Sequence, residues 1–258
     1  MKLLAAFAAA TALATPAGYV QAQQRDDGSF GDPQLTAWAT LGLVAAGAEA
    51  GGAADYLARQ EPETATDAAL VAMARAAAGD HPSDLLPRLR SHRPGKLVNA
   101  TIWTILALRQ AKEPAPPPLV QALIRAQRPS GGWSWLQGGA ADANDTAAAL
   151  QALRAAGVRG RPIERGVAFL RRHQNRDGGF ELTLGRGSDT QSTAWAIQGL
   201  LAAGRAPGAP AFRYLARMHR PDGSYRYSTR YATTPLWVTA QVLPALARKP
   251  FPLRAATP

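Results

Sequence analysis

A short turn motif recurs four times in the chain, and it constrains the fold more than any other feature of the sequence. Each copy has a polar residue six positions before an aromatic residue and a glycine two positions before it. Glycine reaches positive φ angles without steric cost, so each copy predicts a tight turn. The copies run over residues 24–30, 127–133, 174–180 and 219–225. Such internal recurrence indicates a repeat architecture.

A helical segment follows the turns and supplies the second half of each repeat. Several of these segments end in Ala-Ala-Gly or a close variant, and glycine at that place stops a helix. The stops are Gly47, Gly79, Gly157 and Gly204. Three of these glycines, Gly47, Gly157 and Gly204, have a threonine eleven residues earlier, namely Thr36, Thr146 and Thr193. The same three have an aspartate fifteen residues earlier, namely Asp32, Asp142 and Asp189. Four tryptophans are predicted to share the position two after the threonine: Trp38, Trp103, Trp195 and Trp237. The small Gly42 and Gly199 are expected to let neighbouring helices approach closely.

The segments after the turns, such as 35–46 and 192–203, are apolar nearly all round, which predicts burial on every side. The preceding segments, such as 163–173 and 211–219, are amphipathic. Buried helices alternating with half-exposed ones predict two concentric layers. We therefore expect an all-α fold, an α/α toroid with about six helical hairpins in inner and outer rings. Only five outer helices are readable after residue 22, so the ring lacks one or an uncleaved N-terminus completes it.

The N-terminal residues 1–22 have the pattern of a secretory signal peptide. Lys2 precedes an apolar stretch over 3–14, and Val20-Gln21-Ala22 is a small-x-Ala cleavage motif. The expected domains are this signal and an α/α-toroid repeat domain over 23–258, in a secreted or periplasmic protein. An alanine-rich first helix that stays on the protein is the alternative. The apolar stretch is too short to span a bilayer, so no integral membrane segment is predicted after signal removal.

The net charge of +11 comes mostly from arginines that are spread along the helices. Nucleic-acid binding needs a concentrated basic patch, so we expect a solvated basic surface and no nucleic-acid partner. The chain has no cysteine, which removes thiolate nucleophiles and cysteine-ligated zinc. The four histidines are not spaced as a metal-binding set. No cofactor and no metal site are predicted.

The Gln-x-x-x-Gly-x-aromatic turn and the Thr-Ala-Trp-Ala helix resemble the repeat of squalene–hopene cyclases and related terpene cyclases. They are also similar to the prenyltransferase/squalene-oxidase repeat. The resemblance covers about residues 24–247 and implies an α/α toroid in which glutamine and aromatic residue tie an outer helix to the following turn. Protein prenyltransferase β-subunits need a cysteine in their zinc site, and this chain has none.

Residues 142–147, Asp-Ala-Asn-Asp-Thr-Ala, resemble the Asp-x-Asp-Asp-Thr-Ala motif of class II terpene cyclases. The resemblance implies that the middle aspartate is the general acid, and here that position is Asn144. An amide cannot deliver a proton as a carboxylic acid does. Class II cyclases also place their cavity between two helical barrels, and this chain has the length for one. Both departures count against the family chemistry.

Candidate ligand-binding residues lie at the starts of inner helices and in one loop. The aspartates either cap helices or form a polar cluster around a cavity mouth. The four tryptophans are expected to fill the space between the two rings, with an aromatic cage in the lumen as the alternative. The predicted ligand-binding residues are Asp32, Trp133, Trp135, Asp142, Asn144, Asp145 and Asp189.

Three functions are compatible with this pattern. The first is an exported, non-catalytic toroid whose loop-bearing end binds a hydrophobic or polar small molecule, or a protein at the cell surface. The second is a class II terpene cyclase/mutase-like enzyme that acts on an isoprenoid with Asp145 or Asp142 as an altered acid. The third is a carbohydrate-active α/α-barrel enzyme with Asp142 and Asp189 as paired carboxylates. We expect the first.

Overall fold

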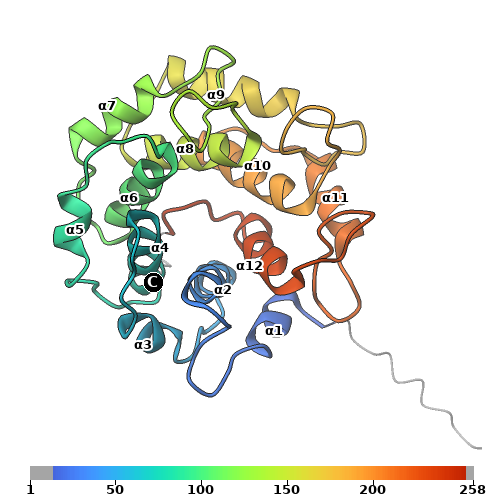
Figure 1. Cartoon of the computed structure of the whole chain (residues 1–258). Helices are drawn as coiled ribbons and strands as arrows, with labels where there is room; N and C mark the ends of the chain where they lie inside the picture. Colours follow the sequence, from blue (N-terminus) through green and yellow to red (C-terminus); the bar gives the residue numbers. More distant parts are fainter. Residues whose placement is uncertain (1–13, 254–258) are drawn as a thin grey trace, which may run out of the picture.

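The computed structural model describes residues 14–253, whose twelve helices form two concentric rings (Figure 1). The inner ring consists of α2 (Pro33–Ala46), α4 (Ala65–Ala77), α6 (Val98–Gln110), α8 (Ala143–Ala155), α10 (Thr190–Ala202) and α12 (Pro235–Leu246). The outer ring consists of α1 (Pro16–Gln21), α3 (Ala53–Ala58), α5 (Leu86–Arg90), α7 (Pro117–Arg125), α9 (Arg161–Arg172) and α11 (Ala209–Met218). Each inner helix packs against the next, and α12 packs against α2, so the inner ring is closed. The predicted all-α toroid is confirmed.

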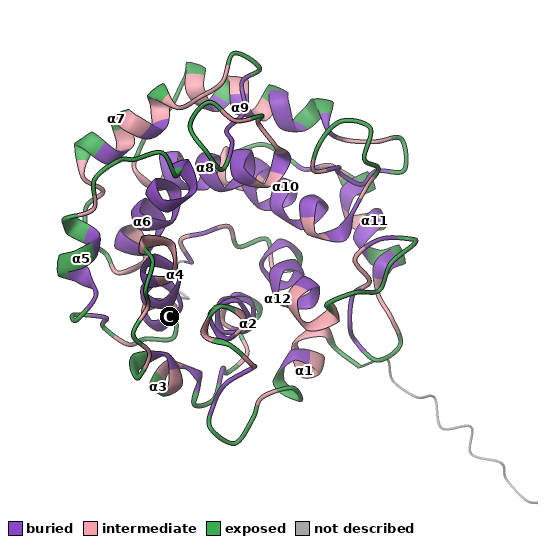
Figure 2. Cartoon of the chain, viewed as in Figure 1, coloured by how far each residue is buried: buried purple, intermediate pink, exposed green. Residues whose placement is uncertain are grey.

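Burial follows the two rings as the sequence predicts. The inner helices are buried along most of their length, whereas α9 and α11 bury one face and expose the other (Figure 2). The predicted glycine stops are also confirmed, since all four have positive φ angles between 69° and 93°. No helix within residues 14–253 is long and apolar enough to cross a bilayer.

Two glycines allow inner helices to pack at short distance, as expected. A Cβ atom added to Gly199 of α10 would lie 2.7 Å from the Cα atom of Ala147 in α8. A Cβ atom on Gly42 of α2 would overlap the carbonyl oxygen of Ala240 in α12. Protein interiors are packed to crystal density, so neither crossing has space for one more methyl group.

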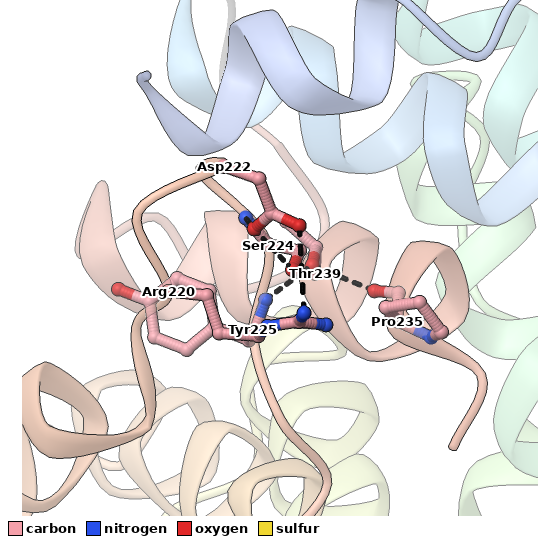
Figure 3. Close-up of polar contacts among 6 residues, drawn as sticks. All are labelled: Arg220, Asp222, Ser224, Tyr225, Pro235 and Thr239. Carbon is pink, nitrogen blue, oxygen red and sulfur yellow. Dashed lines mark hydrogen bonds and ion pairs between the residues drawn. The ribbon is translucent and has the colours of Figure 1, made fainter. Parts of the chain in front are cut away.

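A threonine near the start of the inner helix fixes each turn to that helix. The hydroxyl oxygen accepts a hydrogen bond of 2.8–3.0 Å from the backbone N–H of the turn's aromatic residue. Figure 3 shows this bond for Tyr225 and Thr239, whose own hydroxyl donates to the carbonyl of Pro235 at 2.6 Å. The four pairs are Phe30 with Thr36, Trp133 with Thr146, Phe180 with Thr193, and Tyr225 with Thr239. This contact sets the register of turn and helix in every full repeat.

The glutamine that opens a turn connects it to the next outer helix. The Nε2 atom of Gln127 donates to the carbonyl of Gly131 in its own turn and to that of Pro162 in α9, both at 2.8 Å. Gln24 makes the equivalent bonds to Gly28 and Ala50 at 2.9 and 2.8 Å. The structural role that the resemblance implies for this glutamine is therefore confirmed.

Part of the basic charge has a structural role. The Nε atom of Arg109 in α6 donates to the carbonyl of Ala155, which ends α8, and Arg154 in α8 donates to Ala202, which ends α10. The last carbonyls of a helix have no intrahelical partner and carry partial negative charge, so cations near them are stabilising. Some arginines thus connect consecutive inner helices rather than forming only a solvated surface.

Candidate functional site in the lumen of the inner ring

The six inner helices surround a cavity of about 320 Å³ at the end where they begin. Each helix contributes residues from its first two turns. Residues four apart share one face of a helix, so the contributions form two layers. The first layer contains Gln34, Thr66, Asn99, Asn144, Gln191 and Trp237. The second layer contains Trp38, Leu70, Trp103, Ala148, Trp195 and Gln241.

The tryptophans of the second layer meet one another at the centre of the ring. The ring centroids of Trp38 and Trp103 lie 5.3 Å apart, those of Trp38 and Trp195 5.6 Å, and those of Trp103 and Trp195 5.7 Å. All three pairs are edge-to-face, a favoured arrangement for aromatic rings. The expectation that these rings fill the space between inner and outer helices is therefore wrong. Their shared position faces the axis of the toroid.

Trp237 does not share the position of the other three tryptophans. The turn bond from Tyr225 identifies Thr239 as the threonine of the last repeat, so Trp237 lies two residues before it, in the first layer. Gln241 takes the second-layer place and accepts hydrogen bonds from Trp195 Nε1 at 2.9 Å and Gln191 Nε2 at 2.8 Å. The predicted register was wrong because α12 has no Ala-Ala-Gly stop from which to count.

The C-terminal segment closes the far end of the lumen, and Figure 1 shows it crossing the ring after α12. The ring of Phe251 lies 6.1 and 6.4 Å from those of Trp195 and Trp38. Its backbone N–H donates to Gln151 Oε1 at 2.7 Å, and that of Leu253 donates to Gln110 Oε1 at 2.6 Å. Among the described residues this segment covers the far end of the lumen, and the cavity opens toward the loops that precede the inner helices.

Asp145 is the most perturbed acid in the lumen. Only 7% of its surface is exposed, and its Oδ1 atom accepts a hydrogen bond from Asn99 Nδ2 at 3.1 Å. Burial, the charge of Asp142 and a hydrogen bond with the Asp142 side chain raise the pKa of Asp145 to about 8. Burial disfavours the ionised carboxylate, and a second carboxylate nearby disfavours it further. At neutral pH this side chain is therefore mainly a protonated carboxylic acid.

The three aspartates at the starts of inner helices are all N-caps. Asp32, Asp142 and Asp189 accept hydrogen bonds from the backbone N–H of the third residue after each, at 2.7, 2.9 and 2.7 Å. Such caps satisfy N–H groups that lack a partner in the first turn. Asp142 also lines the cavity, whereas Asp32 and Asp189 do not. The carbohydrate-active hypothesis pairs Asp142 with Asp189, and the cavity contains only the first of them.

The two loop tryptophans have different surroundings. Trp135 is 54% exposed and lines the mouth of the cavity. Trp133 has no exposed surface, and its Nε1 atom donates to the carbonyl of Leu123 at the end of α7 at 2.7 Å. Trp133 is thus the buried aromatic residue of its turn, placed in the core rather than at the mouth.

Asn144 occupies the first-layer position in α8, so the position that the resemblance assigns to an acid does face the lumen. Its Oδ1 atom and that of Asn99 are buried without a hydrogen-bond partner among residues 14–253. Buried polar atoms normally have partners, so two free acceptors favour a ligand that donates a hydrogen bond. The turn and helix patterns in the sequence did not identify the lumen residues Gln34, Thr66, Asn99, Gln191 and Gln241. Counting two residues either side of the threonines at positions 36, 101, 193 and 239 would have found all of them except Thr66, because α4 has alanine at the place of the threonine.

The comparisons agree with this architecture. The family model of the squalene-hopene cyclase C-terminal domain matches residues 93–257. A search of the curated proteins finds no match to the sequence. A protein from Actinoplanes superposes with a TM-score of 0.69 at 20% identity, covering 90% of this chain and 97% of that one. The apo type II terpene cyclase MstE from Scytonema gives a TM-score of 0.68 at 17% identity, covering 90% and 95%.

A variant of the same Scytonema enzyme, in complex with its substrate geranylgeranyl dihydroxybenzoate, gives a TM-score of 0.63 at 17% identity, covering 90% of this chain and 94% of that one. These coverages correct one expectation. A type II terpene cyclase of nearly the same extent as this chain exists, so a single toroid does not by itself argue against cyclase chemistry.

Proposed function

Because the chain belongs to the squalene-hopene cyclase C-terminal domain family, we propose that its tryptophan-lined lumen binds a small isoprenoid-like molecule without transforming it. One observation carries this proposal. The first layer of the lumen includes the position of the family's acid, and every residue in that layer is neutral, with a carboxamide at Asn144. The lumen therefore lacks an acid at the position that the family motif assigns to one.

The apolar part of the ligand would lie against the second layer. Aromatic ring faces pack well against branched hydrocarbon and can stabilise a cation. A volume of about 320 Å³ is near the lower end for ligand pockets. At roughly 30 Å³ for each water-sized group, it holds roughly ten non-hydrogen atoms. A longer chain would extend past Trp135. The isoprenoid substrate of the Scytonema enzyme supports this ligand class.

The polar end of the ligand would lie in the first layer. The Oδ1 atoms of Asn99 and Asn144 offer two acceptors without partners among the described residues. A hydroxyl group would donate to one of them. A prenyl alcohol of about ten carbon atoms therefore matches the lumen in size and in polarity.

Titration of the full chain with geraniol tests the proposal. Lumen tryptophans should report binding as a saturable change in fluorescence. Native mass spectrometry of protein purified from its own host should show a retained molecule of low mass. A flat titration and a clean mass without ligand would refute small-molecule binding and favour a protein partner.

Two alanine variants give a matched comparison. Ala148→Phe places a ring in the second layer of the lumen, so geraniol affinity should fall at least about tenfold. Ala126→Phe adds the same ring at a separate outer hollow of about 230 Å³ beside α7. This control should bind geraniol as the unmodified protein does. Equal affinity in both variants would place the ligand outside the lumen.

Asp145 favours a second candidate function, a cyclase with a displaced acid. General acids work best when they are protonated at the working pH, and the raised pKa of Asp145 meets that condition. Its carboxyl group lies one residue from the family position, on the wall of the same cavity. The carboxylic acid would transfer its proton to one carbon of an alkene, and the positive charge formed on the other carbon would face the tryptophans.

Product analysis separates the two candidates. Incubation with geraniol, farnesol and squalene, followed by gas chromatography and mass spectrometry, should return unchanged substrate if the protein only binds. A cyclic product that disappears in Asp145→Asn would establish the second candidate and overturn the first. If Asn144→Asp acquires cyclase activity, the lumen retains the geometry of an ancestral cyclase.

A further inference from the structure

The sixth outer position of the toroid is filled by α1, which lies within the residues expected to form the signal peptide. The hydroxyl oxygen of Thr15 accepts a hydrogen bond from the N–H of Gly18 at 3.0 Å, and Pro16 is the first helical residue. A capping threonine followed by proline is a strong start signal for a helix. Figure 1 shows α1 in the outer ring beside α2 and α12. Val20 is fully buried in a cluster with Phe30 and Leu43.

The contact between turn and outer helix shows that α1 belongs to the repeat. In three turns the glycine packs against the next outer helix or the residue that precedes it. An added Cβ atom on these glycines would lie 2.5–2.7 Å from a carbonyl oxygen there. The pairs are Gly28 with Gly52 before α3, Gly131 with Arg165 in α9, and Gly178 with Pro210 in α11.

The fourth turn makes the same contact with α1. A Cβ atom on Gly223 would lie 2.7 Å from the carbonyl oxygen of Thr15. Figure 3 shows this turn next to the blue N-terminal ribbon. The repeat thus continues from α11 through its turn to α1, and the outer ring closes through residues 15–21. Cleavage after Ala22 would remove this helix and uncover the apolar cluster that Val20 completes.

A second cleavage motif lies directly before α1. Ala12-Leu13-Ala14 has small residues at both positions that signal peptidases require, and it ends the apolar stretch after Lys2. We propose that the chain is exported to the periplasm or the medium, and that its leader is removed between Ala14 and Thr15 rather than after Ala22. A signal peptidase of the host would hydrolyse this bond, with water supplying the hydroxyl of the Ala14 carboxyl group and a hydrogen for the Thr15 amine.

Expression of the full chain in a Gram-negative host tests the proposal. The exported form is purified, its N-terminus is sequenced and its intact mass is measured. The expected sequence begins Thr-Pro-Ala. A sequence that begins Gln-Gln-Arg, or a protein that retains Lys2, would overturn the proposal. The N-terminal sequence does not depend on geraniol binding. A failure of the cleavage proposal can therefore be distinguished from a failure of the proposed function.

Two leucine variants distinguish the cleavage sites. Ala14→Leu should block processing and leave the precursor, whereas Ala22→Leu should give the same Thr15 terminus as the unmodified chain. Both positions are exposed, so neither change disturbs the core. The reverse pattern would assign cleavage to Ala22.

Stability of the mature protein provides an independent measurement. Val20→Asp would place a carboxylate in the buried cluster, so the melting temperature should fall by roughly 5–10 °C. Gln23→Asp, at an exposed position, is the matched control and should leave it nearly unchanged. If Val20→Asp has no effect on the mature protein, α1 is not part of it.

Discussion

Replacing Asp145 by asparagine should stabilise the protein, and the gain should grow with pH. Burial beside Asp142 raises the folded-state pKa of Asp145 above its ordinary value of 3.8, to about 8. The folded protein therefore holds a proton that the unfolded chain releases. Stability from this group is complete below pH 4 and is lost as pH rises through the folded-state pKa. Asparagine has nearly the shape of the protonated acid and does not titrate.

The magnitude follows from the two pKa values. Each pH unit between them corresponds to about 1.4 kcal/mol of stability. The free energy of unfolding of Asp145→Asn should exceed that of the unmodified protein by about 1 kcal/mol more at pH 5 than at pH 4, because pH 4 lies close to the unfolded-state pKa. At pH 7 the stability advantage of Asp145→Asn should exceed its value at pH 4 by roughly 4 kcal/mol. Near pH 8 this advantage should level off.

Urea unfolding at pH 4, 5, 6, 7 and 8 measures this difference. The slope of the stability difference against pH matters more than its absolute value, because the new amide also changes its contact with Asn99. The exposed substitution Asp26→Asn controls for the loss of one negative charge. A stability difference for Asp145→Asn that stays constant from pH 5 to pH 8 would show that Asp145 is ionised in the folded protein. That result would rule out Asp145 as a proton donor at neutral pH.

Three further predictions concern the repeat and the floor of the lumen. Gly199→Ala should lower the free energy of unfolding by about 1–3 kcal/mol, because the new methyl group meets Ala147 across the α8–α10 crossing. An unchanged urea midpoint would argue against the close contact. Thr193→Val should cost about 1–3 kcal/mol, since the buried N–H of Phe180 loses its acceptor; urea unfolding measures this, and a neutral result would mean that another group replaces the hydroxyl. Phe251→Ala should lower the free energy of unfolding by about 3–5 kcal/mol, because it leaves a cavity beneath the tryptophans. Thermal unfolding followed by tryptophan fluorescence should show a lower midpoint and an altered spectrum. An unaltered midpoint would show that the C-terminal segment does not support the lumen.

Much of the architecture was predictable because the features of the repeat depend on residues close together in the chain. Turn glycines, helix stops and apolar periodicity depend on local backbone geometry and on the burial of side chains. The same local logic explains the caps, since Asp32, Asp142 and Asp189 bond to N–H groups three residues away. Export and cleavage are also read from local composition, and they stay a proposal.

The lumen was harder to predict because its residues are assembled across the ring. Asn99 and Asp145 are 46 residues apart in the chain, yet their side chains share a hydrogen bond. The raised pKa of Asp145 depends on burial by several helices, which no local pattern specifies. Trp237 was placed in the wrong layer because the last helix carries no stop glycine, and only the bond between Tyr225 and Thr239 defines its register.

The sequence alone determined that this chain forms a two-layered ring of helical hairpins, because the repeated turn and the all-round apolar helices permit few other folds. It also determined that an amide stands at the acid position of the family motif. The tertiary structure decided what closes the ring and what fills it. Residues 15–21 complete the outer layer, and the tryptophans converge on the axis, because both outcomes depend on contacts between helices far apart in the chain.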